Sequence, residues 1–348
     1  MEKNQMKKLS FASDYMEGAH PLILQRLTET NMIQSPGYGA DSFSESARRK
    51  IREACQSPEA EIYFLAGGTQ TNSAVITSML RPWEGVLSAS TGHISAHEAG
   101  AVEHGGHKVL PLPHSCGKIT AADVRSYMLG FEEDENHDHM VFPGMVYISQ
   151  PTEYGTLYSL EELTALSHVC SEFRLALYVD GARLAYALAC PENDVFLPDL
   201  ARLCSAFYIG GTKCGALFGE ALVFPVSGTV PHFFTFIKQH GALLAKGRIA
   251  GLQFDTLFTD GLYTEAGRNA IASADRIRRA LKSKNYDLPV DSPTNQIFIR
   301  LEPSRWEVLS RDVDLSFWEK TSDGKIILRI ATSWATRRED VDRLIDLL

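Results

Sequence analysis

The feature that most constrains the fold is a series of short apolar segments that alternate with helix-like segments. Seven segments have the length and composition of buried strands: residues 61–67, 85–90, 107–113, 145–151, 175–181, 206–211 and 220–225. Helix-like stretches such as 71–80 and 159–173 lie between them. This alternation predicts an α/β domain in which helices cover a mostly parallel, seven-stranded sheet.

The pattern changes after about residue 228. A long, mainly helical stretch runs to about residue 284, and strand-like segments at 295–301 and 325–334 precede a helix-like C-terminus. The acidic segment 130–144 shows no periodicity and is expected to be a loop. The sequence therefore predicts three parts, which are an N-terminal arm (1–35), a large α/β domain (36–228) and a smaller α+β domain (229–348).

Composition argues against several classes of protein. The 348 residues carry a formal net charge of −9, which disfavours a nucleic-acid-binding surface. The six cysteines form no C-x-x-C pair, and this disfavours a zinc or redox motif. No run approaches the roughly 20 apolar residues of a membrane span, and the N-terminus has no signal-peptide core. We therefore expect a cytoplasmic protein without nucleic-acid or membrane partners.

One lysine, Lys213, lies within the otherwise apolar segment 206–224. Desolvation favours the neutral, nucleophilic amine, so this setting suits a lysine that bonds covalently to a carbonyl carbon. Asp180 ends a strand-like segment, and ligands of open α/β sheets bind at such strand ends. Arg183 follows it and suits bidentate binding of an anion. A structural Asp180–Arg183 ion pair is the alternative.

The segment "GGTQTN", residues 67–72, turns from a strand into a helix. Backbone N–H groups at the start of a helix, together with Thr69, Thr71 and Asn72, suit a phosphate. An ordinary capped turn between strand and helix would have a similar composition. The segment therefore indicates a phosphate site only in combination with other evidence.

His93 and His97 are four residues apart, and Glu98 follows. This spacing raises the possibility of a zinc site, but the order H-x-x-x-H-E differs from H-E-x-x-H and no third ligand is evident. An imidazole that stacks on a flat ligand and a capping histidine are the better interpretations, so no metal is expected.

Together these groups match the requirements of pyridoxal phosphate. A lysine holds this cofactor as a Schiff base, and a carboxylate keeps its ring nitrogen protonated so that the ring accepts electrons. The start of a helix binds its phosphate. The sequence therefore predicts a binding site for pyridoxal phosphate.

The same segments resemble the threonine aldolase and β-eliminating lyase family of pyridoxal-phosphate enzymes, which has the aminotransferase type I fold. The resemblance covers nearly the whole chain. "FASDYMEGAHPLILQRL" is similar to the family's S-D-x-x-x-G-x-H-P, "PGYGAD" to Y-G-x-D, "GGTQTN" to S-G-T-x-x-N, and "HISAHEAGA" to H-I-x-x-x-E-x-G. "VDGARL" is the strongest match, and "GGTKCGALFGEALVF" resembles the lysine segment. Each motif is weak alone, but their order and spacing are specific.

The resemblance implies a role for each matching residue. Lys213 would bind the cofactor as an internal aldimine, Asp180 would pair with the ring nitrogen, and His93 would stack on the ring. Gly68, Thr69 and Asn72 would bind the phosphate, and Arg183 would bind the ring hydroxyl or the substrate carboxylate. Ser13 and Arg329 would bind that carboxylate. Lys246 and Arg248 would contact a neighbouring subunit's cofactor. The last pair implies a homodimer or homotetramer.

The resemblance also implies a reaction, the retro-aldol Cα–Cβ cleavage of L-threonine, L-allo-threonine or both to glycine and acetaldehyde. The base is open among His93, a loop histidine (His137 or His139) and a bound water. β-Elimination, transamination and a non-catalytic amino-acid- or cofactor-binding protein are the alternative functions. Tyr178, where the family often has histidine, and Cys214, where it commonly has glycine, leave the substrate preference open.

Overall fold

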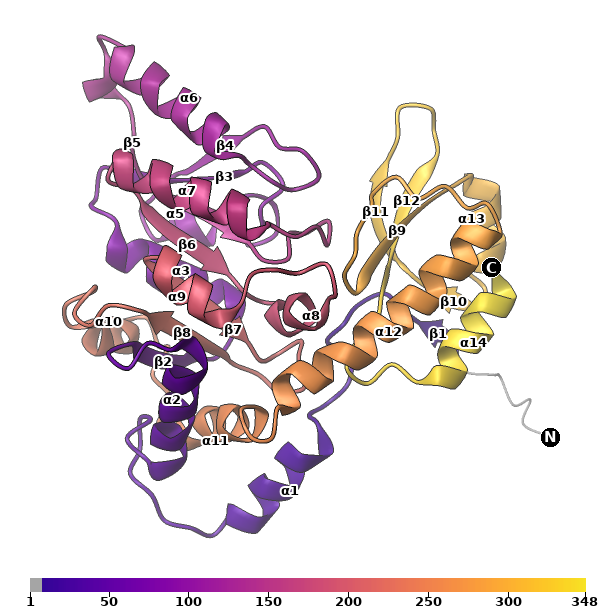
Figure 1. Ribbon diagram of the computed structural model, residues 1–348, viewed down its shortest axis with the longest axis horizontal. Coiled ribbons are helices and arrows are strands. Elements are labelled where there is room, and N and C mark those ends of the chain that lie inside the picture. The colour runs from indigo at the N-terminus through magenta and orange to yellow at the C-terminus, as the bar shows by residue number, and fades with distance from the viewer. Residues whose placement is uncertain (1–7) are drawn as a thin grey trace.

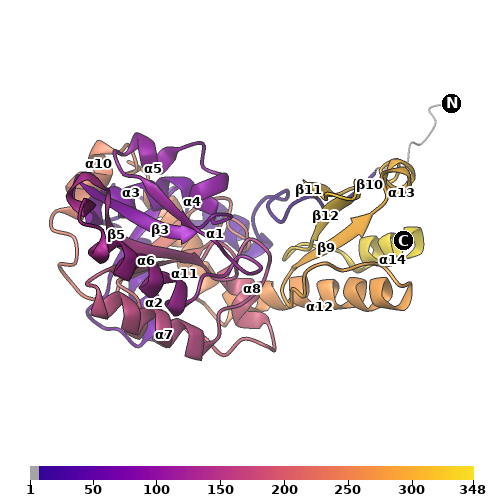
Figure 2. The same cartoon turned by 90° about the horizontal axis from the view of Figure 1, so that it is seen from above.

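The computed structural model describes residues 8–348, which form a large and a small lobe connected by one long helix (Figure 1; Figure 2). The large lobe contains a seven-stranded sheet in the order β2-β8-β7-β6-β5-β3-β4. Its strands are β2 (Glu61–Leu65), β3 (Glu84–Ala89), β4 (Val109–Leu112), β5 (Phe142–Ser149), β6 (Ala176–Asp180), β7 (Ala206–Gly210) and β8 (Glu220–Phe224). Only β8 runs antiparallel to its neighbours in this sheet. All seven predicted strands and the mostly parallel sheet are confirmed.

Side chains of the sheet alternate between two buried layers. In β5, Val146 and Ile148 pack into one apolar cluster, whereas Met145 and Tyr147 pack into the other. This alternation follows from the two-residue period of a strand, and burial on both faces explains why these strands are continuously apolar. The helices of the first layer are α2 (Ser42–Cys55), α6 (Ala121–Glu133), α7 (Leu160–Glu172), α9 (Leu197–Leu203) and α11 (Arg248–Leu257). Those of the second layer are α3 (Gly68–Met79), α4 (His93–Ala96), α5 (Ala101–His104) and α10 (Phe233–Gln239).

Part of the acidic segment expected to be a loop is helical. Helix α6 starts with a capping box between Thr120 and Asp123 and continues to Glu133. Phe131, inside the predicted loop, is buried in the core, and this burial extends the helix. One 3₁₀ turn, His137–His139, then leads into β5.

The small lobe contains a three-stranded antiparallel sheet in the order β11-β12-β9. Its strands are β9 (Gln296–Leu301), β11 (Ser316–Lys320) and β12 (Ile326–Ala331), and its helices are α13 (Pro303–Leu309) and α14 (Arg338–Leu347). The N-terminal strand β1 (Leu9–Ser10) pairs with β10 (Val313–Asp314), so the start of the described arm belongs to the small lobe. Residues 1–7 of the predicted arm lie outside the described residues.

Helix α12 (Leu262–Ser283) connects the lobes, with α8 (Leu184–Ala189) packed against it in the large lobe and α14 in the small one (Figure 1). The contact with α8 is close because Gly267 faces it: a Cβ there would lie 2.2 Å from the carbonyl oxygen of Ala185. Helices α10 and α11 contact α3 and α2, respectively. Residues 233–257 therefore pack with the large lobe, although the sequence predicts that the large domain ends at residue 228.

Helix α1 (Pro21–Thr30) lies beside α11 and projects from the large lobe (Figure 1). Among residues 8–348, the helices are all too short or too polar to cross a membrane.

Candidate active site

A cleft opens where the parallel strands of the large sheet end. Its cavity of about 280 Å³ is lined by residues that follow β2, β3, β5, β6 and β7, and it shares Lys213 and His93 with an adjoining chamber of about 510 Å³. The chamber extends to β11 and β12 of the small lobe. Because ligands of α/β sheets bind at the carboxyl ends of the strands, this position makes the cleft the candidate active site.

Asp180 lies at the bottom of the cleft at the end of β6, and four donors surround its carboxylate. Its oxygens accept hydrogen bonds from Tyr147 Oη (2.5 Å), Asn72 Nδ2 (3.1 Å), the Ala182 amide (3.0 Å) and the Tyr208 hydroxyl. Burial alone would raise the pKa of Asp180, but the charge of His93 and these hydrogen bonds lower it overall. Asp180 is therefore held as an anion, and the alternative Asp180–Arg183 ion pair is absent from the described residues.

Lys213 follows β7 and faces both the cleft and the chamber. Within residues 8–348 its amine makes no ion pair or hydrogen bond, and it lies 5.9 Å from the centre of the Tyr15 ring. The side chain is partly exposed. The apolar residues of segment 206–224 form β7 and β8, so the amine faces an open cleft instead of the apolar surroundings expected from the sequence.

The start of α3 supplies unsatisfied backbone donors to the cleft. Gly68 and Thr69 line the cavity, and the N-cap residue Gly67 provides no side-chain cap. An uncapped helix N-terminus is a binding site for an anion. Asn72 does not line the cavity, because its amide lies below in a buried network and its Oδ1 accepts from the Tyr178 hydroxyl at 2.8 Å. Tyr178 is likewise buried below the cleft.

His93, at the start of α4, lies on the wall of the cleft. Its Nδ1 is 2.7 Å from Glu98 Oε1, and its backbone amide donates to Glu153 Oε1 at 2.9 Å. The His97 ring centre lies 5.8 Å from that of His93 and 6.3 Å from that of Trp318. No cluster of three or more metal-ligating side chains occurs among the described residues.

Arg183 is already paired with an acid that the sequence analysis did not single out. Its Nε and Nη2 donate to the two carboxylate oxygens of Asp14 at 2.7 and 3.0 Å, and Asn295 Nδ2 donates to the same carboxylate at 2.9 Å. Burial would raise the pKa of Asp14, but Arg183 lowers it to about 2. This cluster joins the N-terminal segment, the large lobe and the small lobe beside the cleft.

Arg329, on β12, contributes a cation from the small lobe. Its Nη atoms donate to Gln296 Oε1 (3.0 Å) and the Ala12 carbonyl (3.2 Å), while its buried Nε has no partner within residues 8–348. The buried Oγ of Ser13 also lacks a partner there. Burial and the charge of Arg183 lower the pKa of Arg329 to about 10. This guanidinium therefore lacks a carboxylate partner, and a bound anion would supply one.

Four other predicted residues lie away from this cleft. Arg248 donates to the Ile33 and Thr30 carbonyls beyond the end of α1, and the exposed Lys246 precedes it. His137 and His139 precede the N-terminal end of β5, whereas the cleft lies at the opposite end of that strand. Eight strand residues span about 26 Å, so these two histidines are excluded as a base in this cleft.

The family of the chain follows from comparison with known proteins. The family model described as beta-eliminating lyase matches residues 10–294, a span that contains Asp180 and Lys213. The chain belongs to the beta-eliminating lyase family. A low specificity L-threonine aldolase from a Pseudomonas species is 30% identical over 345 residues, which are 96% of this chain and 95% of the relative. A relative of the same name from Pseudomonas aeruginosa is 29% identical and covers 97% of this chain and 95% of its own length.

Solved structures agree with this family. A Leishmania major threonine aldolase is 43% identical with a TM-score of 0.94, over 97% of this chain and 98% of that one. A Thermus thermophilus aspartate aminotransferase shares the fold, with a TM-score of 0.72 at 15% identity over 98% of this chain and 90% of that one. The predicted aminotransferase-like fold is confirmed.

Two buried carboxyl groups of this family member were missed by the sequence analysis. Glu153 lines both cavities and accepts from Ser149 Oγ at 2.7 Å. Glu220 accepts from Thr212 Oγ1 (2.8 Å) and the Gly211 amide (3.1 Å) beside Lys213. Glu220 begins an apolar strand, and an acid in that position was the signal that could have revealed it.

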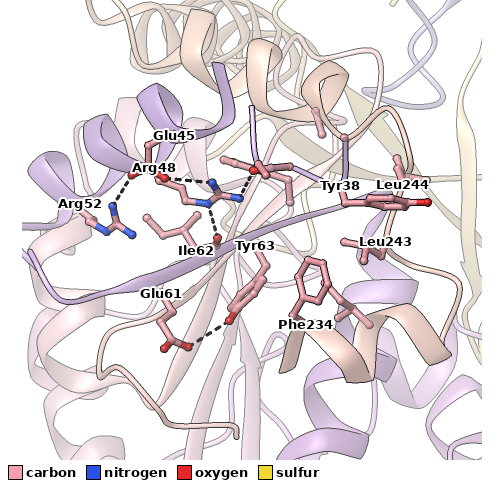
Figure 3. Close-up of a pocket in the computed structure, with 16 residues that line it drawn as sticks. Tyr38, Glu45, Arg48, Arg52, Glu61, Ile62, Tyr63, Phe234, Leu243 and Leu244 are labelled. Carbon is pink, nitrogen blue, oxygen red and sulfur yellow. Dashed lines mark hydrogen bonds and ion pairs between the residues drawn. The ribbon is translucent and has the colours of Figure 1, made fainter. Parts of the chain in front are cut away.

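A separate cavity, of about 400 Å³, lies along the free edge of β2 and shares no lining residue with the cleft (Figure 3). Arg48 and Arg52 both pair with Glu45, and Arg48 also donates to the Gly39 carbonyl. Their charges are thus already paired, so this cavity is not a second candidate for the active site.

Proposed function

We propose that the cleft binds pyridoxal phosphate and cleaves L-threonine, L-allo-threonine or both to glycine and acetaldehyde. The observation that carries this proposal is the convergence of three groups on connected cavities: the Lys213 amine, the anionic Asp180, and the Arg329 guanidinium, which has no carboxylate partner within residues 8–348. The similarity to relatives named threonine aldolase supports the choice of substrate.

The residues of the cleft fit this cofactor. Lys213 offers a free amine to its aldehyde carbon, Asp180 offers a carboxylate to its ring nitrogen, and the uncapped N-terminus of α3 offers backbone donors to its phosphate. When bound, pyridoxal phosphate supplies an electron-accepting ring conjugated with the substrate's Cα. Asn72 has a different role from the predicted one, because its amide supports Asp180 from below.

Arg329 and Ser13 would hold the substrate carboxylate. Arg329 Nε and Ser13 Oγ are buried atoms without partners among the described residues. Arg329 lines the chamber, whereas Ser13 lines neither cavity, so the guanidinium would be the main contact of the carboxylate. A fixed carboxylate also fixes rotation about the substrate's Cα. The clamp would thereby set which bond at Cα is presented for cleavage, and it would favour Cα–Cβ over Cα–H by orientation.

His93 would take the proton of the β-hydroxyl group at Nε2, because Glu98 occupies Nδ1. Loss of this proton turns the β-carbon into the carbonyl carbon of acetaldehyde as the Cα–Cβ bond breaks. One proton must then reach Cα to give glycine, which balances the reaction.

The first test is the release of acetaldehyde from L-threonine and L-allo-threonine with pyridoxal phosphate supplied. Lys213→Ala should abolish release and the absorbance of lysine-bound cofactor, whereas Lys108→Ala, at an exposed position outside the cleft, should retain both. Undiminished release from Lys213→Ala would refute the role of this lysine. The ratio of the two wild-type rates would define the stereochemical preference.

β-Elimination is the second candidate, because the matching family model carries that description. It releases ammonia and a 2-oxo acid where the aldolase releases glycine and an aldehyde. Assay of ammonia with serine, cysteine and aromatic amino acids therefore separates the two functions. Ammonia without acetaldehyde from a yellow protein would favour the lyase.

We further propose a homodimer or homotetramer. Helix α1 and the residues after it expose Leu22, Leu24, Met32 and Ile33. Lys246 does not line the cleft of its own subunit. A second copy would cover the apolar side chains and bring Lys246 to the neighbouring cleft. Sedimentation equilibrium tests the assembly. Recovery of activity on mixing Lys213→Ala with an inactive Lys246→Ala variant would show that the subunits share sites, and a monomer would refute the proposal.

A further inference from the structure

Glu98 lies directly behind His93 and is enclosed by protein. Its side chain has no exposed surface. Oε1 is 2.7 Å from His93 Nδ1 and 2.7 Å from Asn72 Nδ2, whereas Oε2 has no partner within residues 8–348. A buried carboxylate in this state requires a compensating positive charge nearby.

The hydrogen bonds of Asn72 define the direction of this network. Asn72 Nδ2 faces two carboxylates, Glu98 Oε1 and Asp180 Oδ2, while its Oδ1 accepts from the Tyr178 hydroxyl. Carboxylates accept and amide nitrogens donate, so both hydrogens of Nδ2 are used and the amide orientation is determined.

The same argument assigns the proton between His93 and Glu98. A proton on Oε1 of Glu98 would weaken the bond from Asn72, because a hydroxyl oxygen is a poorer acceptor than a carboxylate oxygen, and a proton on Oε2 would leave a buried hydroxyl without an acceptor. The carboxylate form accepts both bonds at Oε1 at full strength, and it requires His93 Nδ1 to be the donor.

We propose that Glu98 is a positioning residue: it fixes Nδ1 as the protonated nitrogen of His93, pairs with the charge of the ring, and leaves Nε2 as the nitrogen that exchanges a proton with a ligand in the cleft. Asn72 links this pair to Asp180. The network therefore connects the histidine on the wall of the cleft to the carboxylate at its bottom.

The charges around His93 agree with this assignment. Burial lowers the pKa of His93, but the hydrogen bond that its ring makes to Glu98 and the charge of Asp180 raise it, Lys213 opposes them, and the net direction is upward. Glu153 and His97 are the other titratable groups that interact with the ring. Removal of the Glu98 charge should therefore lower the His93 pKa.

Histidine-selective NMR of the full-length protein loaded with pyridoxal phosphate tests the proposal without an activity assay. His93→Asn identifies the resonance. Glu98→Gln, which keeps the shape and removes the charge, should lower the His93 pKa by about one unit or more. Glu103→Gln, an exposed carboxylate on α5, is the matched control and should leave it unchanged. An unchanged pKa in Glu98→Gln would overturn the proposal.

A second measurement needs no Glu98 variant and holds even if that variant fails to fold. The ¹⁵N shifts of the neutral His93 ring in the wild-type protein should show the proton on Nδ1. A proton on Nε2 of the neutral ring would overturn the assignment of Glu98.

A third measurement rests on the proposed function. If His93 is the base, the acidic limb of kcat/KM against pH should move to lower pH in Glu98→Gln by the same amount as the NMR pKa. A shifted NMR pKa with an unmoved limb would support the role of Glu98 and refute His93 as the base. The failure of one proposal is thus distinguishable from the failure of the other.

Discussion

At the scale of single residues, the pKa values of two buried acids near Lys213 are shifted in opposite directions. Arg183 and Asn295 lower the pKa of Asp14 to about 2 even though burial alone would raise it. Burial raises the pKa of Glu220 to about 7, and hydrogen bonds from Thr212 and Gly211 offset it only in part. The partners of each carboxyl group, more than its depth, decide its charge at neutral pH.

Glu220→Gln should therefore change the pH dependence of stability. The folded protein retains the Glu220 proton between the ordinary pKa of 4.5 and the raised pKa of about 7, so stability falls as pH rises through this window. The loss amounts to roughly 3 kcal/mol. The free energy of urea unfolding should be measured for Glu220→Gln and wild type at pH 5 and pH 8. The difference between the two proteins should shift in favour of Glu220→Gln from pH 5 to pH 8. Glu29→Gln, at the surface, serves as control, and parallel curves for Glu220→Gln and wild type would refute the prediction.

Single residues also show how far the sequence alone predicts the site. Asp180, Lys213 and His93 were predicted because each ends or follows a recognisable local segment. The bond from Asn72 to Asp180 spans 108 residues, and that from Arg183 to Asp14 spans 169. No local pattern specifies such pairs, so Asn72 was assigned to the phosphate and Asp14 was overlooked.

At the scale of elements, side chains of helix α2 donate hydrogen bonds to backbone carbonyls at the free edge of β2. Arg48 Nε donates to the Ile62 carbonyl at 3.1 Å (Figure 3). Arg52 Nε donates to the Ala60 carbonyl at 2.9 Å. These side chains supply the donors that a neighbouring strand would otherwise supply. Helix α2 thereby provides hydrogen-bond donors for two backbone carbonyls at this edge of the sheet.

Arg48→Ala should lower stability by about 1–3 kcal/mol, because it removes donors to two backbone carbonyls, Ile62 and Gly39. Arg49→Ala is the matched control on the same helix, since Arg49 is exposed and pairs only with Glu53. It should change stability by less than about 1 kcal/mol. The midpoints of urea unfolding compare the two, and equal losses would argue against this role of Arg48.

The elements themselves were predicted well where burial decides them. All seven strands of the large sheet are short and apolar on both faces, and this property is visible in the sequence. Segment 130–144 was predicted less well, because the burial of Phe131 depends on a contact with Phe142 of β5, whose ring centre lies 5.1 Å from that of Phe131. A tertiary contact extended the helix beyond the point where its polar composition suggested an end.

At the scale of the whole molecule, the chamber that adjoins the cleft is formed between the two lobes. His93 and Lys213 come from the large lobe, whereas Trp318 and Arg329 come from the small one. The sequence could not show which helices belong to which lobe, because amphipathic periodicity reports that a face is buried and not what buries it. The relative placement of the lobes by α12 thus determines how far Arg329 lies from the cleft.

Arg329→Met tests this division of roles. It removes the charge but retains an unbranched stem that can pack near Trp318, over which the guanidinium lies at 5.7 Å. A charged hydrogen bond is worth about 1.5–3 kcal/mol, so kcat/KM for threonine should fall about ten- to hundredfold. The absorbance of lysine-bound cofactor should persist, because Arg329 does not line the inner cleft. Arg300→Met, on the neighbouring strand β9 and paired with Asp287, is the control and should leave kcat/KM within about twofold. Unchanged kcat/KM in Arg329→Met would place the substrate carboxylate elsewhere, and Arg183 would then be the next cation to test.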